Sequence, residues 1–175
     1  MAHYLKATYY LFDNSENILN TNSSTSDFEN FIKNLDENSW FISASSRHSW
    51  SAIIISEILE KSNNINALSF LTEIRTLESE YKFILISPDS YTKIVTDINN
   101  LILWCKSHIM ILCGITQEGY SPAQTLSFIE NIDDNHPDLD VENVISLFLY
   151  LRRILKMISY AEKKQQTILC LSYRH

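Results

Sequence analysis

The clearest pattern of apolar and polar positions lies between Asp140 and Lys164. On the helical period of about 3.6 residues, apolar side chains fall on one broad arc and polar side chains fall opposite. A helix with so wide an apolar arc must be covered by other elements on most of its surface. The arc holds Val144, Leu147, Phe148, Leu151, Ile154, Leu155 and Ile158, and the polar face holds Glu142, Ser146, Arg153, Lys156 and Lys163.

Charged residues mark both ends of this predicted helix. Asp138, Asp140 and Glu142 lie around its first turn, and Lys163 and Lys164 lie near its end. This order complements the helix dipole, which favours negative charge at the N-terminus and positive charge at the C-terminus. We therefore expect this stretch to form the central helix against which the rest of the chain packs.

Apolar segments rich in β-compatible residues lie at the two ends of the chain. His3–Phe12 reads HYLKATYYLF and Thr167–Tyr173 reads TILCLSY, and both predict strands. A further short strand is predicted over 81–86, while 39–46 favours either a strand or an extended connector. We expect the two terminal strands to pair with each other in a small sheet.

Helical periodicity fills most of the chain between the terminal strands. Ser26 or Asp27 is expected to cap the first helix. Ser87 and Pro88 predict the start of a helix that continues to near Gly114. The sequence thus predicts a mainly α-helical α+β fold, a helical body with a small sheet that pairs the N- and C-terminal strands. Besides the central helix, the predicted helices cover 26–36, 48–62, 67–80, 88–114 and 122–132.

Length and composition describe one domain over residues 1–175. The chain is 45% hydrophobic and 20% charged, which suits a globular protein with a substantial core. We expect no secretory signal, because the N-terminus has no basic segment leading into an apolar run. No apolar run is long enough to span a bilayer, so we expect a cytoplasmic protein without membrane contact. The odd number of cysteines, three, predicts reduced core residues and no disulfide framework.

Residues that could carry chemistry are scattered. Two glycines are too few for a glycine-rich phosphate loop. Cys105 and His108 lie one helical turn apart, which suits a pair of metal ligands, but no further ligands complete a known motif. No nucleophile, base and oxyanion donors can be assigned from the sequence. We therefore expect no enzymatic activity, no catalytic residues, no cofactor and no metal site.

The formal net charge of −7 is concentrated in one part of the chain. Between Ser107 and Leu151 there is no lysine or arginine. Two interpretations are open: the acids cap and complement a helix, or they form an acidic surface that binds a basic partner. Direct binding of nucleic acid is disfavoured, because it requires a basic surface. The acidic residues of this stretch are Glu118, Glu130, Asp133, Asp134, Asp138, Asp140 and Glu142.

Two details refine the acidic stretch. An EF-hand calcium loop needs a central glycine, and this stretch has Pro137 in that region, which argues against calcium. Tyr120 lies in the loop sequence QEGYSP, close to the acids, and an exposed aromatic residue there could anchor an interface. Packing of Tyr120 into the core is the alternative.

The stretch EGYSPAQTLSFIENI, residues 118–132, is similar to segments of bacterial immunity proteins that neutralise contact-dependent growth inhibition toxins or related polymorphic toxins. A small, acidic single domain with reduced cysteines also resembles that class. The resemblance implies tight binding to one cognate toxin domain, a basic nuclease such as an EndoU-type RNase, by blocking its active site or substrate groove. Tyr120 and the seven acids would then be the toxin-binding residues.

A second resemblance belongs to a different class. Mainly helical chains of this length also resemble the poxviral helical inhibitors of apoptosis and innate signalling, which bind a partner helix in an apolar groove. The Asn-Trp-Gly-Arg type motif of the cellular family is absent from this sequence. The predicted terminal strands also do not fit an all-helical bundle, so this interpretation ranks second.

Overall fold

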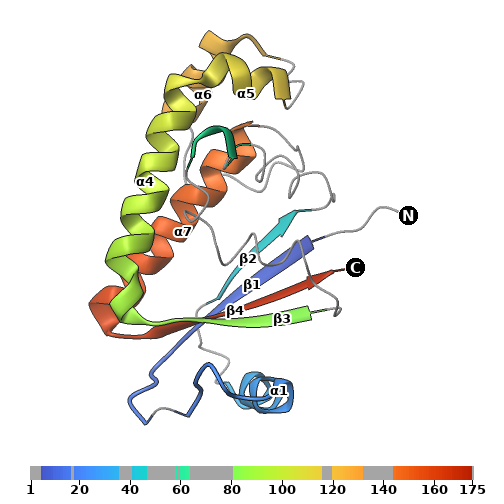
Figure 1. Cartoon of the computed structure of the whole chain (residues 1–175), viewed down its shortest axis with the longest axis vertical. Helices are drawn as coiled ribbons and strands as arrows, with labels where there is room; N and C mark the ends of the chain where they lie inside the picture. The colour runs from blue at the N-terminus through green and yellow to red at the C-terminus, as the bar shows by residue number, and fades with distance from the viewer. Residues whose placement is uncertain are drawn as a thin grey trace.

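One antiparallel sheet and the helices on its two faces make up the part of the chain that the computed structural model describes, which is residues 5–16, 18–35, 41–46, 58, 60–63, 81–115, 120–131 and 144–174. The sheet has four strands in the order β2-β1-β4-β3, and every neighbouring pair is antiparallel (Figure 1). The strands are β1 (Leu5–Phe12), β2 (Phe41–Ser46), β3 (Tyr81–Ile86) and β4 (Thr167–Arg174).

The terminal strands pair along their whole length, from Leu5 opposite Arg174 to Phe12 opposite Thr167. The predicted pairing of the N- and C-terminal segments is therefore confirmed, and so is the mainly helical α+β fold. β1 and β4 occupy the centre of the sheet, with β2 and β3 at its edges. This long-range pairing closes the fold, because it joins the first and last elements of the chain.

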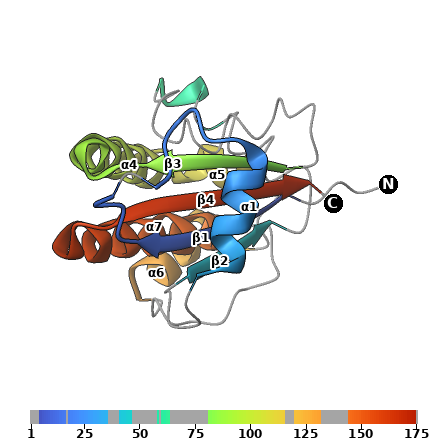
Figure 2. The same cartoon turned by 90° about the horizontal axis from the view of Figure 1, so that it is seen from below.

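Side chains alternate between the two faces of the sheet, as the twofold period of a strand requires. Tyr9, Ile168 and Cys170 contribute to one apolar cluster, while Phe12 and Leu169 contribute to another. The first cluster packs on helices α4 (Tyr91–Ser107) and α7 (Val144–Lys164), and the second packs on α1 (Thr25–Lys33). Figures 1 and 2 show α1 alone on one face and the longer helices on the other.

The predicted central helix is α7. Its buried surface is wider than the predicted arc, because the helix packs against the sheet, α4 and α6 (Pro122–Asn131). Besides four residues of the predicted arc, four further residues are buried. The buried side chains are Ile145, Phe148, Leu149, Leu151, Ile154, Met157, Ile158 and Ala161.

The end of α7 reverses the chain into β4. Gln165 has a left-handed backbone with φ of 55°. Its N–H donates to the carbonyl of Glu162 at 3.1 Å, and the N–H of Gln166 donates to the carbonyl of Ala161 at 2.9 Å. These two bonds are the pair that closes a helix in the Schellman motif. Gln165 and Gln166 therefore separate α7 from β4.

The N-cap of α1 is Ser24, so the prediction that Ser26 or Asp27 caps this helix is wrong. The backbone N–H of Asp27 donates to the Ser24 Oγ at 3.3 Å, and the Ser24 backbone N–H donates to the Asp27 carboxylate at 2.8 Å. This reciprocal arrangement is a capping box. Hydrogen bonds from the Ser24 side chain and backbone lower the pKa of Asp27.

The predicted helix over 88–114 is interrupted. A short 3₁₀ turn, η2 (Pro88–Ser90), precedes α4, and α5 (Ile109–Ile115) follows it after a break at His108. At His108 the backbone is not helical, with φ of −118° and ψ of 28°. The imidazole stacks on the Trp104 ring, with centroids 4.4 Å apart, and its Nδ1 lies 2.9 Å from the Trp104 carbonyl oxygen. These local contacts stabilise an end to α4 that the apolar pattern does not predict.

Two other predicted helices fall largely outside the described residues. Of the helix predicted over 48–62, Ile58, Glu60 and Lys61 are described and are helical. Asn63 follows with a left-handed φ of 54°, which agrees with the predicted end of that helix. The helix predicted over 67–80 lies outside the described residues.

Candidate functional site

Helices α5 and α6 form the end of the molecule opposite α1 (Figure 1). α6 begins as predicted at Ser121 and Pro122. The Gln124 backbone N–H donates to the Ser121 Oγ at 3.3 Å, and the Ser121 backbone N–H donates to the Gln124 Oε1 at 3.0 Å. This reciprocal cap satisfies two N–H groups that a helix start leaves without a backbone partner.

Contacts beneath this end hold α6 in place. Thr125 and Ile129 are buried, and the Cys113 Sγ on α5 lies 3.7 Å from the Thr125 Oγ1. At the other end of α6, the Arg152 Nη1 on α7 donates to the carbonyl of Ile129 at 3.2 Å. A cation at this position complements the negative end of the helix dipole. α6 is therefore fixed both to α5 and to the central helix.

Large apolar side chains remain exposed on these two helices. Met110 on α5 is 76% exposed, and Ile111 beside it is also exposed. Tyr120, just before α6, and Phe128 on α6 are 47% and 46% exposed, with ring centroids 5.1 Å apart. We call these four side chains the α5–α6 surface. Exposed methionine and aromatic residues are typical of protein-binding surfaces.

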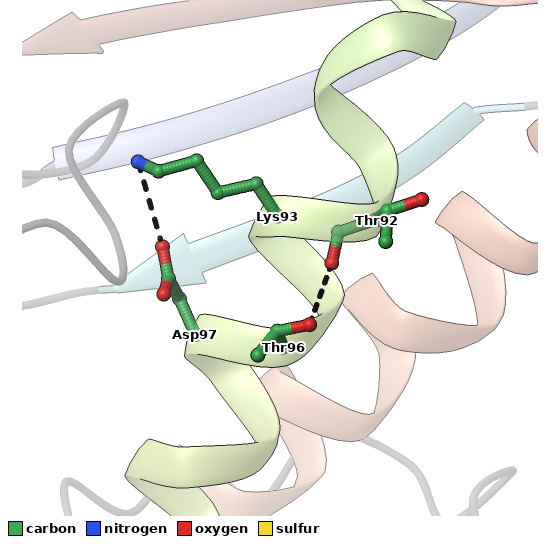
Figure 3. A network of polar contacts seen from close by, with 4 residues as sticks. All are labelled: Thr92, Lys93, Thr96 and Asp97. Atoms are coloured by element: carbon green, nitrogen blue, oxygen red, sulfur yellow. Dashed lines mark hydrogen bonds and ion pairs between the residues drawn. The ribbon is translucent and has the colours of Figure 1, made fainter.

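The first turns of α4 offer a contrast within the same helical layer. The exposed Lys93 pairs with the half-buried Asp97, with nitrogen and oxygen 3.7 Å apart, and the Thr96 hydroxyl donates to the Thr92 carbonyl at 2.8 Å (Figure 3). A pair near the surface at that distance contributes little to stability. Its position shows that the outer face of α4 is polar at its start, whereas Leu103, two turns beyond Thr96 on the same face, is exposed.

Of the residues predicted to bind a toxin, Tyr120 and Glu130 lie in the described part of the chain. Tyr120 is not packed into the core, which was the alternative, and Glu130 is exposed in the last turn of α6. Both therefore lie at the α5–α6 end. The remaining predicted residues lie outside the described residues: Glu118, Asp133, Asp134, Asp138, Asp140 and Glu142.

Charge-based reasoning missed Met110, Ile111 and Phe128. In the sequence, IMIL and LSFI look like core segments, because short apolar runs are usually buried. The available signal was helical phase. Ile109 and Leu112 are buried on one side of α5, so Met110 and Ile111 fall on the other side.

A buried tyrosine and a partly buried tyrosine form a polar contact at the edge of the described core. The hydroxyl oxygens of Tyr9 on β1 and Tyr150 on α7 share a hydrogen bond at 2.6 Å. Burial raises the pKa of both phenols, and for Tyr9 the neighbouring Tyr150 and Cys170 raise it further. This contact joins the sheet to the central helix, and burial keeps both hydroxyl groups protonated.

Two further titratable groups also serve packing. The Tyr91 hydroxyl donates to the carbonyl of Gln166 at 2.6 Å, which ties the start of α4 to the start of β4, and burial raises its pKa. Burial also raises the pKa of the Cys105 thiol to about 12. A thiol with so high a pKa is a weak nucleophile.

The possible metal pair Cys105 and His108 does not come together as ligands. Cys105 is fully buried, whereas the His108 ring stacks on Trp104 and uses its Nδ1 in the contact with the Trp104 carbonyl. Among the described side chains, no three His, Cys, Asp or Glu residues form a group that could hold a metal ion. All three cysteines are free, and Cys113 alone is half-buried where the prediction was a core residue.

No match to this chain is found among protein-family models, curated proteins or solved structures. Within the described residues, none of the helices combines the length and the apolar character needed to cross a membrane.

Proposed function

We propose that this protein is an immunity-type inhibitor, which binds and neutralises a cognate toxin domain in the cytoplasm. The observation that carries the proposal is the exposed Tyr120–Phe128 pair at α6, a helix that also exposes Glu130 and lies in a stretch of chain without lysine or arginine. Apolar anchors supply binding energy, and surrounding acids attract a basic partner and reject acidic ones. A basic nuclease domain, such as an EndoU-type RNase, fits this chemistry.

The protein acts by binding and not by catalysis in this proposal. The described groups with raised pKa, which are Tyr9, Tyr91, Tyr150 and Cys105, lie in the core and make structural contacts. Perturbed groups at an active site lie instead in a cleft where a substrate can reach them. This distribution supports an inhibitor that acts through its surface.

The second candidate is a helix-binding inhibitor of the poxviral type. The exposed apolar side chains of α5 and α6 would suit a partner helix. The four-stranded sheet at the centre of this fold weighs against it, because that class is an all-helical bundle. Salt separates the two candidates, since binding through acids weakens as salt rises and binding through an apolar groove does not.

A pulldown with the tagged protein, followed by a nuclease assay, tests the proposal. We expect recovery of a basic nuclease domain that is released as salt rises. Its purified activity should fall in proportion to added protein and reach full inhibition at a one-to-one ratio. A recovered partner with no activity that the protein inhibits would contradict the proposal, and a partner helix that stays bound at high salt would favour the second candidate.

The acidic stretch has its own test in the same assay. Reversal of Asp133, Asp134 and Asp138 to lysine should slow association with the nuclease and remove its salt dependence. The matched control reverses Glu16, Asp13 and Asp89, which lie elsewhere in the chain, and so changes the net charge equally. If affinity and salt dependence survive the first set of reversals, the acids of 133–138 serve only the helix start.

A further inference from the structure

The two faces of the sheet are covered to different degrees. On the face that carries α4 and α7, Tyr9, Ile86 and Cys170 are at most 4% exposed. On the face that carries α1, Tyr10 and Leu85 are only half-buried, although they lie next to Tyr9 and Ile86 in the same strands. Figure 2 shows α1 crossing the strands on this face, with the longer helices on the other. The α1 face of the sheet is therefore the less protected one.

Aromatic rings connect α1 to the sheet. Phe28 stacks on Phe83 of β3 with ring centroids 4.9 Å apart, and Phe31 packs on Phe12 of β1 with centroids 4.6 Å apart. Phe28 is the one buried residue among the nine of α1. A helix of that length is not stable alone in water, so α1 depends on these contacts. Because they bury little apolar surface, breaking them costs less free energy than unfolding the whole protein.

The hydrogen bonds around α1 are local. The Asn14 side chain donates to the carbonyl of Leu19 at 2.9 Å and accepts from its N–H at 3.3 Å. Ser24 and Asp27 form the capping box at the start of the helix. These bonds join residues no more than five positions apart, so their loss leaves the hydrogen bonds of the sheet intact. We call the segment that contains them, residues 14–35, the lid.

Polar contacts between distant residues fasten the opposite face. The hydrogen bond between Tyr9 and Tyr150 joins β1 to α7, and that from Tyr91 to the Gln166 carbonyl joins α4 to the start of β4. The apolar cluster on that side is also separate from the cluster beneath α1. Loss of the contacts of α1 therefore leaves the larger core in place.

We propose that the lid opens as one unit over the sheet while β1, β4, α4 and α7 stay folded. Opening detaches Phe28 and Phe31 from their ring partners and uncovers Phe83 and Leu169, so α1 controls access to this apolar face of the sheet. The lid is a property of the fold alone, and it stands or fails independently of the inhibition of a nuclease.

Amide hydrogen exchange of the unchanged protein, followed by NMR at low urea concentrations, tests the lid. The N–H groups of Leu19, Phe28 and Leu35 are each bonded within the lid. We expect these three to exchange with one small urea dependence, and to be at least about tenfold less protected than the amides of β4. Equal protection and equal urea dependence in the lid and in β4 would overturn the proposal, because the lid would then open only when the whole protein unfolds.

Two cysteine substitutions compare the faces of one strand. Ile168 and Leu169 are adjacent in β4, both are 0% exposed, and they belong to opposite clusters. Each is replaced by cysteine in a chain whose three native cysteines are changed to alanine, and urea unfolding measures the stability of each variant. Leu169→Cys should react with a small thiol reagent at least about tenfold faster than global unfolding allows, whereas Ile168→Cys should not. Reaction of Leu169→Cys only at the rate of global unfolding would contradict the lid.

A matched pair of cap variants tests whether the lid is one unit. Ser24→Ala removes the cap of α1 and should speed exchange of the Phe28 and Leu19 amides equally, by about fivefold. Ser121→Ala removes the similar reciprocal cap of α6. It should speed exchange in β4 and leave the lid amides unchanged, because the lid opens without α6. If Ser121→Ala speeds lid exchange as much as β4 exchange, or if Ser24→Ala leaves Leu19 unchanged, the lid is not an independent unit.

Discussion

The core between α7 and the sheet and the surface on α5 and α6 use the same residue types in opposite ways. In the core, Phe148 and Met157 have almost no exposed surface, and the buried hydroxyl of Tyr9 has a partner. At the α5–α6 end, Phe128 and Met110 stay in contact with solvent. The core residues therefore stabilise the fold, whereas the exposed residues are available to a partner. Matched substitutions of one residue type in both regions test this division.

The phenylalanine pair should show the largest difference. Phe148→Ala removes a ring that is 1% exposed, and we expect it to lower the free energy of unfolding by about 3–5 kcal/mol. Phe128→Ala removes a ring that water already reaches, and should cost less than about 1 kcal/mol. Urea titrations followed by circular dichroism measure both. Similar losses in the two variants would break the division between the regions.

The tyrosine contact tests how the core treats polar groups. Tyr9→Phe leaves the Tyr150 hydroxyl without its partner, and should cost about 1–3 kcal/mol of unfolding free energy, as should Tyr150→Phe. The double variant has neither hydroxyl group, so no hydroxyl is left unpaired. Its loss of unfolding free energy should therefore be smaller than the sum of the two single losses. Denaturant titrations of all four proteins complete the cycle. If the two single losses add up to the loss in the double variant, the Tyr9–Tyr150 contact contributes no coupling energy.

The same hydroxyls predict how stability responds to alkali. Unfolded tyrosine loses its proton near its ordinary pKa of 10.0, whereas burial raises the pKa of Tyr9, Tyr91 and Tyr150 in the folded protein. Above pH 10 the unfolded state therefore binds fewer protons than the folded state, and stability falls as pH rises. The decline should be shallower in Tyr9→Phe than in the unchanged protein. Tyr120→Phe, at the exposed surface, serves as the control.

One substitution in the turn from α7 into β4 should increase stability modestly. Gln165 has a left-handed backbone that costs energy for any residue except glycine, and Gln165→Gly should raise the free energy of unfolding by about 0.5–1 kcal/mol. Gln165→Ala is the matched control. It also removes the side-chain bond from Nε2 to the Glu162 carbonyl, but it keeps the backbone strain. If Gln165→Gly and Gln165→Ala change stability equally, then glycine does not relieve the backbone strain at this position.

The two regions also differ in how far the sequence predicts them. Apolar periodicity predicts the strands β1 and β4 and the helix α7. It succeeds there because an apolar residue that faces a large core is buried whichever side chains surround it. The end of α4 at His108 depends on one ring stacking on Trp104, and the choice of Ser24 as N-cap depends on where the α1 side chains Phe28 and Phe31 meet the sheet. No periodic pattern encodes such contacts.

The candidate site was predictable in its charge and not in its apolar part. Glu130 and its neighbouring acids stand out in the sequence, because lysine and arginine are missing around them. Met110 and Phe128 do not stand out, since the exposure of an apolar residue on a short helix depends on which sides of that helix other elements cover. Only the packing of α5 on α4 and α6, and of α6 on α7, decides this.

The methionine pair compares Met110→Ser, the substitution with the smallest expected effect on stability, with the same substitution at Met157 in the core. Met110→Ser replaces a side chain that is 76% exposed, and should change the free energy of unfolding by less than about 0.5 kcal/mol. Met157→Ser places a hydroxyl in the apolar core that α7 covers, and we expect it to lower the free energy of unfolding by more than about 2 kcal/mol. Thermal and urea unfolding measure both losses, and a loss in Met110→Ser as large as that in Met157→Ser would place Met110 in the core. If Met110→Ser leaves the unfolding curve unchanged but removes binding of the partner recovered in the pulldown, then exposure at this position serves recognition, since it contributes nothing to the fold.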